Sequence, residues 1–228
     1  MKLESTKIQS FFAISDGISL MNMICGFISI LFAINHNFES SAILMIIAIM
    51  FDSVDGWVAR KINRNDALKF GQNIDSLSDA ISFGAAPAVF LYTISSTIPH
   101  NLSIIPTIIS LLIVACGILR LTRYNAIADH IQTHDFIGFP IPGIAIILAT
   151  FYLSGLFNIY LALILMIIVS LLMISNVTYP KFDNLIIIVL IVLIILPISL
   201  TLFGINIPAL ILLIFSLYYL LINLIKIN

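Results

Sequence analysis

The chain is dominated by apolar stretches that are each long enough to cross a lipid bilayer. A membrane-spanning helix needs roughly 20 predominantly apolar residues. Only 9% of the residues are charged, against about 25% in a typical soluble domain. These features predict an all-α membrane protein, a polytopic bundle of about eight transmembrane helices. The predicted spans lie near residues 16–35, 41–60, 76–95, 103–122, 137–155, 156–175, 185–203 and 206–226.

Lysine and arginine are confined to alternate connections between these stretches. The connections at 36–40, 96–102 and 154–158 contain neither residue type. Because positively charged loops remain in the cytoplasm, the pattern predicts an even number of spans in the cytoplasmic membrane, with both termini cytoplasmic. The start of the chain has no apolar run ending in a small-residue cleavage site, so we expect the first span to be retained. The basic residues are Lys2, Lys7, Arg60, Lys61, Arg64, Lys69, Arg120, Arg123, Lys181 and Lys226.

Polarity is unevenly distributed along what reads as one domain. No linker, low-complexity tract or internal repeat divides residues 1–228. Residues 52–82 hold five acidic and four basic groups, whereas the last two predicted spans, within residues 185–226, are uncharged except at Lys226. We therefore expect the chemistry in the first two-thirds of the chain and a scaffold or lipid-facing role for the end. The net charge of −1 gives no reason to expect a nucleic-acid partner.

Acidic and small residues form two stripes at helical spacing. The first stripe begins at Asp52 and Asp55, and the second ends at Asp75 and Asp79. Steps of three and four residues place side chains on one helix face, so two consecutive antiparallel helices would bring the four carboxylates together. The full set is Asp52, Asp55, Gly56, Ala59 and Arg60, followed by Gly71, Asp75 and Asp79.

Four carboxylates that meet near a membrane interface need positive charge among them, because like charges and burial both disfavour ionisation. Arg60 alone is a poor match for four acids on two helices. Hard oxygen ligands of this kind suit Mg²⁺ or Mn²⁺, which commonly bind a few carboxylates together with substrate phosphates. The small side chains at Gly56, Ala59 and Gly71 leave room for a bulky ligand. We therefore predict a phosphate-bearing ligand over paired metal ions.

The pattern Asp52-x-x-Asp55-Gly56-x-x-Ala59-Arg60, then Gly71-x-x-x-Asp75-x-x-x-Asp79, resembles the signature of the CDP-alcohol phosphatidyltransferases at every fixed position. The stretches at 74–88, 119–125 and 136–143 are similar to the serine-using branch of that family. The resemblance covers most of residues 14–180 and implies a six-helix catalytic core there, with additional helices at 185–226. The stretches at 14–22 and 172–182 look most similar to archaeal members. Asp16 stands where many relatives carry asparagine.

The resemblance implies transfer of a phosphatidyl or archaetidyl group from CDP-diacylglycerol or CDP-archaeol to the hydroxyl of L-serine, with release of CMP. It implies two divalent ions, Mn²⁺ or Mg²⁺, held by the four aspartates, with Asp79 also the base. It assigns Gly56, Ala59, Arg60 and Gly71 to the CDP-lipid. A homodimer in contact with membrane lipids is the implied assembly.

Serine also carries a carboxylate, which a cationic fork would recognise. Arg120 and Arg123, at the cytoplasmic end of the fourth span, are placed to bind that carboxylate or the lipid phosphate. The alternative is that they only follow the positive-inside rule. The sequence does not divide the two tasks between these arginines.

Three other functions remain open at this point. The same fold would serve another acceptor such as inositol phosphate or glycerol phosphate, although the supply of basic residues is thin for a second phosphate. An intramembrane prenyltransferase would not need the stripe of Gly56, Ala59 and Arg60. An ion-coupled transporter would distribute its acids across the bilayer, whereas these acids are crowded at one end.

Weaker signals are read as structural. Cys25 and Cys116 lie inside apolar spans and are predicted to be packing residues. His130 and His134 lack a third ligand at zinc spacing. Trp57 and Tyr124 are predicted to be anchors at the membrane interface, and Pro140 and Pro142 to end or kink the start of the fifth span.

Overall fold

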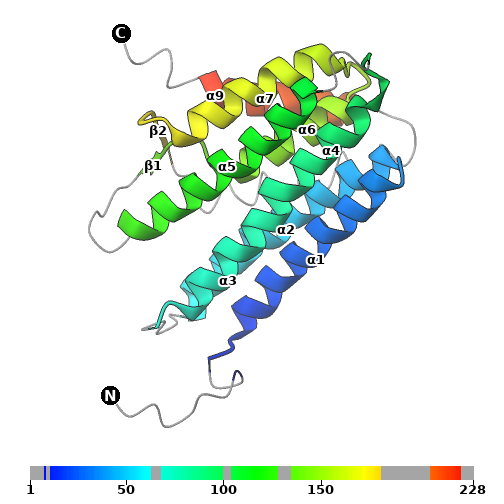
Figure 1. Cartoon of the computed structure of the whole chain (residues 1–228). Helices are drawn as coiled ribbons and strands as arrows, with labels where there is room; N and C mark the ends of the chain where they lie inside the picture. Colours follow the sequence, from blue (N-terminus) through cyan, green and yellow to red (C-terminus); the bar gives the residue numbers. More distant parts are fainter. Residues whose placement is uncertain are drawn as a thin grey trace.

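The protein is predominantly helical, and its long helices run side by side (Figure 1). The computed structural model describes residues 8, 11–62, 68–99, 104–127, 135–180 and 206–221. Within them, four helices are long and apolar enough to cross a membrane: Ile14–Ile34, Phe38–Ala59, Phe70–Ile94 and Ile104–Ile127. The elements are α1 (Ile14–Ile34), α2 (Phe38–Ile62), α3 (Phe70–Asp79), the π-helix η2 (Ala80–Ala85), α4 (Ala86–Ile94), the 3₁₀ turn η3 (Ser95–Thr97), α5 (Ile104–Ile127), β1 (Asp135–Ile137), α6 (Pro142–Leu153), α7 (Ile159–Ile174), β2 (Thr178–Pro180) and α9 (Ile207–Leu221).

The polarity of helix α1 is the reverse of that of an amphipathic helix in a soluble protein, because its exposed face is apolar and its buried face is polar. Its exposed side carries large apolar residues such as Phe27 and Leu31. Its buried side is small and polar, as expected where lipid solvates the apolar surface and small residues let helices approach closely. The hydroxyls of Ser29 and Ser41, 2.9 Å apart, join α1 to α2. The buried residues of α1 are Ser15, Asp16, Ser19, Asn22, Gly26, Ser29 and Ala33.

Helices α3 and α4 form one continuous helix that is interrupted by the π-helix η2. Helix α1 lies against this segment so closely that a Cβ atom on Gly26 would overlap Ser82. The Ser82 hydroxyl donates a hydrogen bond of 2.9 Å to the carbonyl of Asn22. Short π-segments in α-helices are frequent at functional sites, and this one begins directly after Asp79.

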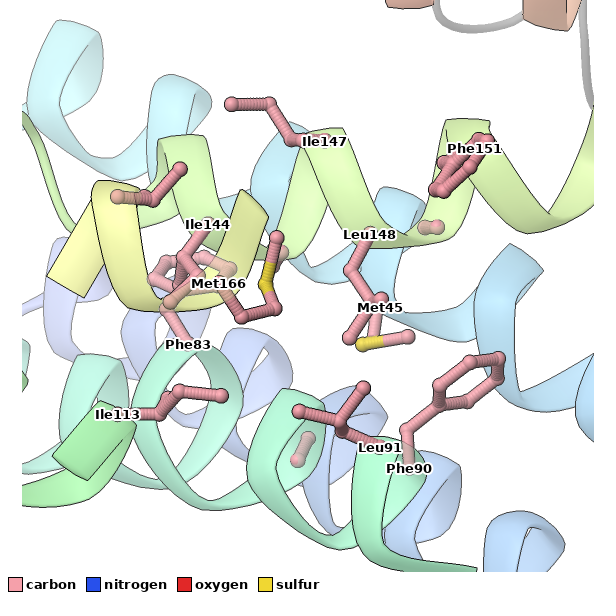
Figure 2. Packing of buried hydrophobic residues seen from close by; sticks show 14 of the residues in the cluster. Met45, Phe83, Phe90, Leu91, Ile113, Ile144, Ile147, Leu148, Phe151 and Met166 are labelled. Carbon is pink, nitrogen blue, oxygen red and sulfur yellow. The ribbon is translucent and has the colours of Figure 1, made fainter. Parts of the chain in front are cut away.

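The apolar core is gathered around α6, which contacts α2, α4, η2, α7 and α9. Figure 2 shows Ile144 and Leu148 of α6 among side chains from the surrounding helices. These residues are fully buried and carry no polar atoms, so they give the bundle a packed centre. The other labelled side chains of the cluster in this view include Met45 of α2, Phe83 of η2, Phe90 and Leu91 of α4, Ile113 of α5 and Met166 of α7.

A short antiparallel ladder joins β1 to β2, with Phe136 opposite Tyr179. Helix α9 packs against this ladder through Tyr219. The Tyr219 hydroxyl donates a hydrogen bond of 2.9 Å to the Pro180 carbonyl, and the rings of Phe139, Tyr179 and Tyr219 pack against one another. Burial raises the pKa of Tyr179, which stays a neutral phenol here.

The observed elements refine the predicted spans. The fifth and sixth predicted spans correspond to α6 and α7, which are shorter than spanning length, and the eighth corresponds in part to α9. The predicted start at residue 137 is wrong, because residues 135–137 pair with β2 and α6 begins at Pro142. The two prolines do delimit that helix, since proline disfavours a helix before itself. The predicted span at 185–203, with Lys181, lies outside the described residues, as do Lys2, Lys7, Arg64, His130, His134 and Lys226.

Both cysteines are free, as expected of packing residues. Cys116 is buried in the apolar core, and Cys25 packs against it. Trp57 and Tyr124 are both partly exposed near basic side chains. Lys61 lies 4.8 Å from the centre of the Trp57 ring.

Candidate active site

Three carboxylates from two helices converge at one end of the bundle. Asp52 and Asp55 belong to α2, and Asp75 belongs to α3. One oxygen from each carboxylate lies within 4.8 Å of the others. The two predicted stripes therefore do face each other at these three positions, and the spacing is short enough for a shared cation.

Asp79, one turn beyond Asp75 on α3, lies beside this group and is also buried. It is 7% exposed and interacts electrostatically with Asp52 and Asp75. The side-chain amide of Asn22 donates a hydrogen bond of 3.1 Å to Asp79 Oδ1. All four predicted aspartates thus belong to one site, with Asp79 held from α1.

The positive charge that faces these acids in the described part of the chain comes from Arg120 of α5. This arginine is 7% exposed and interacts electrostatically with Asp52, Asp75 and Asp79. Its guanidinium also lies over the rings of Tyr124 and Phe136, 5.7 and 5.8 Å from their centres. One guanidinium against four carboxylates leaves the site short of positive charge.

The chemistry of the donor set fits a divalent cation. The Asp55 Oδ2 atom is buried and accepts no hydrogen bond from the described residues. A buried carboxylate oxygen without a partner is costly, and a cation held between Asp52, Asp55 and Asp75 would satisfy it. Carboxylate oxygens are the ligands that Mg²⁺ and Mn²⁺ prefer.

The small residues of the motif lie beside the acids. Gly56 and Ala59 follow Asp55 on α2, and Gly71 precedes Asp75 on α3; all three are partly exposed. They add little bulk beside the carboxylates, as predicted for a surface that a ligand approaches. Their contact with a ligand stays a prediction, and the side chain of Arg60 lies outside the described part of the structure.

The structure gives the two predicted anion-binding arginines different surroundings. Arg120 faces the carboxylates, whereas Arg123 points to backbone carbonyls. The Arg123 guanidinium donates hydrogen bonds to Ile137 at 2.9 Å and to Met173 and Ile174 at 3.0 Å. Arg123 therefore joins the end of α7 to β1.

Two polar features of the site were missed by the sequence prediction. Asn22 contacts Asp79, and Asn125 connects Gln72 to Ser76 on α3 through hydrogen bonds of 3.0 and 2.8 Å. A signal for Asn22 was present, because Ser15, Ser19, Asn22, Gly26 and Ser29 form a stripe of small and polar residues at helical spacing through an apolar span.

Asp16 also lies on the buried face of α1. Its carboxylate accepts a hydrogen bond of 2.8 Å from the backbone N–H of Ala13, which caps the start of the helix. An acidic residue in the first helical turn is favourable. The structure thus gives Asp16 a role in starting α1.

The comparison with known proteins agrees with this geometry. Residues 12–175 match the CDP-alcohol phosphatidyltransferase family, and the chain belongs to it. Over 183 residues, 80% of this chain and 76% of the relative, it is 43% identical to archaetidylserine synthase of Methanothermobacter thermautotrophicus. It is 40% identical to CDP-diacylglycerol--serine O-phosphatidyltransferase of Methanocaldococcus jannaschii over 78% of each chain, and 32% identical to the Bacillus subtilis enzyme of that name over 73% of this chain and 89% of the relative.

Proposed function

We propose that this protein transfers a phosphatidyl-type group from a CDP-linked lipid to the hydroxyl of L-serine and releases CMP, as a step of phospholipid biosynthesis. The observation that carries the proposal is the convergence of the motif carboxylates from α2 and α3 beside Arg120. Serine as the acceptor is supported by the names of the archaeal and bacterial relatives, whose similarity covers most of this chain.

The four aspartates of the motif would bind two divalent ions, Mn²⁺ or Mg²⁺. Asp52, Asp55 and Asp75 form the tight group of oxygens, with Asp79 beside them. When bound, such ions neutralise and orient a diphosphate for displacement. Gly56, Ala59, Arg60 and Gly71 would adjoin the CDP part of the lipid, because they lie on the same two helices one or two turns from the acids.

Asp79 is the proposed base. The serine hydroxyl oxygen attacks the lipid-linked phosphorus, a new P–O bond forms there, and the P–O bond to CMP breaks. The hydroxyl proton passes to the Asp79 carboxylate, and CMP leaves with the electron pair of the broken bond. The hydrogen bond from Asn22 holds the carboxylate at Oδ1, and the same carboxylate also contacts the side chain of Asp52, so Asp79 would accept the proton beside the other acids.

Arg120 is the proposed anion-binding residue of the pair. Its guanidinium is buried against aromatic rings and faces the acidic group, so it is placed to bind the serine carboxylate or a phosphate oxygen. The three carbonyl acceptors of Arg123 favour a positioning role, in which it holds α7 and β1 in place beside α5.

The setting that best suits these substrates is the cytoplasmic membrane, with the site open to cytosol and inner leaflet. The distribution of lysine and arginine supports cytoplasmic termini and about eight spans. We further propose a homodimer and, from the archaeal relative, an archaetidyl lipid as the donor.

The reaction is tested with purified protein and Mn²⁺ by measuring CMP release from CDP-archaeol and from CDP-diacylglycerol. L-serine, inositol phosphate and glycerol phosphate are compared as acceptors. We expect release that depends on serine, that is lost in Asp79→Asn and that is kept in Asp135→Asn, whose carboxylate is exposed on β1. Release with only a phosphorylated acceptor would keep the family and overturn the substrate. If none of the three acceptors supports CMP release, the proposal is contradicted.

A further inference from the structure

Asn22 has surroundings that packing alone does not explain. It lies in the middle of α1 with none of its surface exposed. Its amide nitrogen donates to Asp79 Oδ1, but its own Oδ1 is buried and accepts no hydrogen bond from the described residues. An unsatisfied buried polar atom is costly, so packing alone does not account for an asparagine at this position.

The contact between Asn22 and Asp79 is reinforced on its far side. The backbone carbonyl of Asn22 accepts the Ser82 hydroxyl at 2.9 Å, and Gly26 lets α1 come against Ser82 without a side chain between them. Asp79 and Ser82 lie at and just inside the start of η2. Asn22 therefore contacts the start of the π-segment at two points. Its side chain is hydrogen-bonded to Asp79, and its backbone carbonyl is hydrogen-bonded to Ser82.

The direction of the amide is fixed by charge. A carboxylate accepts hydrogen bonds but does not donate them, so the nitrogen of Asn22 faces Asp79 and the oxygen faces away. This orientation pins one carboxylate oxygen of Asp79 and restricts rotation of the side chain. Together with the contact between Asp79 and Asp52, this fixes the direction of the carboxylate, which is the requirement for a base that must meet a substrate proton.

We infer that Asn22 is a positioning residue for the transfer reaction, which holds the Asp79 carboxylate in the orientation that accepts the acceptor's proton. The inference rests on the proposed role of Asp79 as the base. It assigns Asn22 no contact with substrate and no metal. Its loss should therefore slow turnover, leave substrate binding unchanged and leave the metal site of Asp52, Asp55 and Asp75 in place.

The test compares Asn22→Leu, which keeps the number and branching of the side-chain heavy atoms and removes the amide, with Ser29→Ala. Ser29 lies about two turns further along the same buried face and is hydrogen-bonded to Ser41 instead of Asp79. Removing a side chain that orients a reacting or ligating group commonly costs about 10–100-fold in activity. We expect kcat of Asn22→Leu to fall in that range, with KM for serine and for the CDP-lipid changed by less than about twofold and Ser29→Ala close to wild type.

Binding of Mn²⁺ without substrate, followed by electron paramagnetic resonance, gives a readout that does not depend on turnover. We expect Asn22→Leu to keep Mn²⁺ binding at the group of Asp52, Asp55 and Asp75, which stays in place, so that any weakening is confined to an ion that Asp79 also binds. If Asn22→Leu does not fold, Asn22→Ser takes its place, since a serine hydroxyl is too short to occupy the amide position. Either variant should show the same selective loss of kcat.

Three results would overturn the inference. One is a kcat that stays near wild type in the folded variant. Another is a rise in KM that accounts for the whole loss, and the third is a loss of Mn²⁺ binding equal to the loss of activity. Asp79→Asn, assayed alongside, distinguishes the two hypotheses. If Asp79→Asn is active, both the proposed base and the role of Asn22 are wrong. If Asp79→Asn is inactive and Asn22→Leu is fully active, only the role of Asn22 is wrong.

Discussion

The two ends of helix α2 are built from opposite kinds of residue. At its start, Phe38 packs edge-on against Phe90 of α4 and Tyr152 of α6, with ring centres 5.5 and 6.1 Å away. Near its other end, about 20 Å along the helix, Asp52 and Asp55 face Asp75 of α3. One end is closed by aromatic rings, and the other gathers like charges.

This difference separates stability from function within a single helix. The aromatic end is satisfied by its own contacts, since edge-to-face ring pairs are favourable. The carboxylate end has an unpartnered buried oxygen on Asp55 and four acids near one arginine, which makes it a poor source of stability. Changes at the two ends should therefore have opposite signatures.

The largest effect is expected from Asp55→Asn. Loss of a charged ligand oxygen should lower the rate of CMP release by about 10³-fold, comparable with removal of one strong electrostatic contact in other enzymes. Stability against denaturant in detergent should stay the same or rise, because like-charge repulsion is relieved. Activity assays and unfolding curves on the same sample measure both. A destabilised variant would mean that the acids stabilise the fold, and would contradict the proposed difference between the two ends of α2.

Phe90→Ala should show the reverse pattern. Phe90 is fully buried between Phe38 and Tyr152, so its truncation should leave a cavity and cost about 3 kcal/mol in the free energy of unfolding. The folded fraction should keep near-normal CMP release. The control is Tyr92→Ala on the same helix, which removes a half-exposed ring and should change stability little. Equal effects of both variants would contradict the packing argument.

Gly138→Ala tests the backbone that surrounds Arg123, one helical turn from Arg120. Gly138 has a φ of +81°, and a Cβ there would overlap the Met173 carbonyl and the Arg123 guanidinium. We expect a loss of about 2 kcal/mol in unfolding free energy from backbone strain and displaced hydrogen bonds. Gly84→Ala is the matched control, since its Cβ would meet nothing within 4 Å. A Gly138→Ala protein as stable as the control would show that Arg123 tolerates displacement.

The smallest effect is expected from Tyr219→Phe. This change removes the hydrogen bond from the phenol to the Pro180 carbonyl and leaves the ring packing with Phe139 and Tyr179 in place. The cost should be about 1 kcal/mol, measured as a small shift of the unfolding midpoint. Tyr218→Phe, on the neighbouring exposed ring, should shift nothing, and similar shifts in both would mean that the hydrogen bond contributes no stability.

The carboxylate site could be predicted because its information is local. Asp52 and Asp55, like Asp75 and Asp79, share a helix face by spacing alone, and a short connection between two helices brings the faces together. Membrane helices are also predictable from sequence, since lipid requires long apolar runs. The first four predicted spans correspond to helices of spanning length.

What escaped prediction depends on distant contacts. Arg120 and Arg123 are equivalent by spacing and composition, and only the positions of Ile137, Met173 and Ile174 distinguish them. The hydrogen bond from Asn22 to Asp79 joins residues 57 positions apart. The β1–β2 ladder, which shortens the fifth predicted span, pairs segments on either side of two helices.

The π-helix after Asp79 makes the length of this segment as important as its composition. Each residue of an α-helix turns the chain by about 100°, and a π-segment accommodates one extra residue in its turn. Deleting a single residue between Ala80 and Ala85 would restore a regular helix. It would also rotate Phe90 and the rest of α4 away from their partners while Asp75 and Asp79 kept their places. Substitutions should therefore be tolerated here far better than insertions or deletions, and a change of length should break the register between the carboxylate end and the aromatic end.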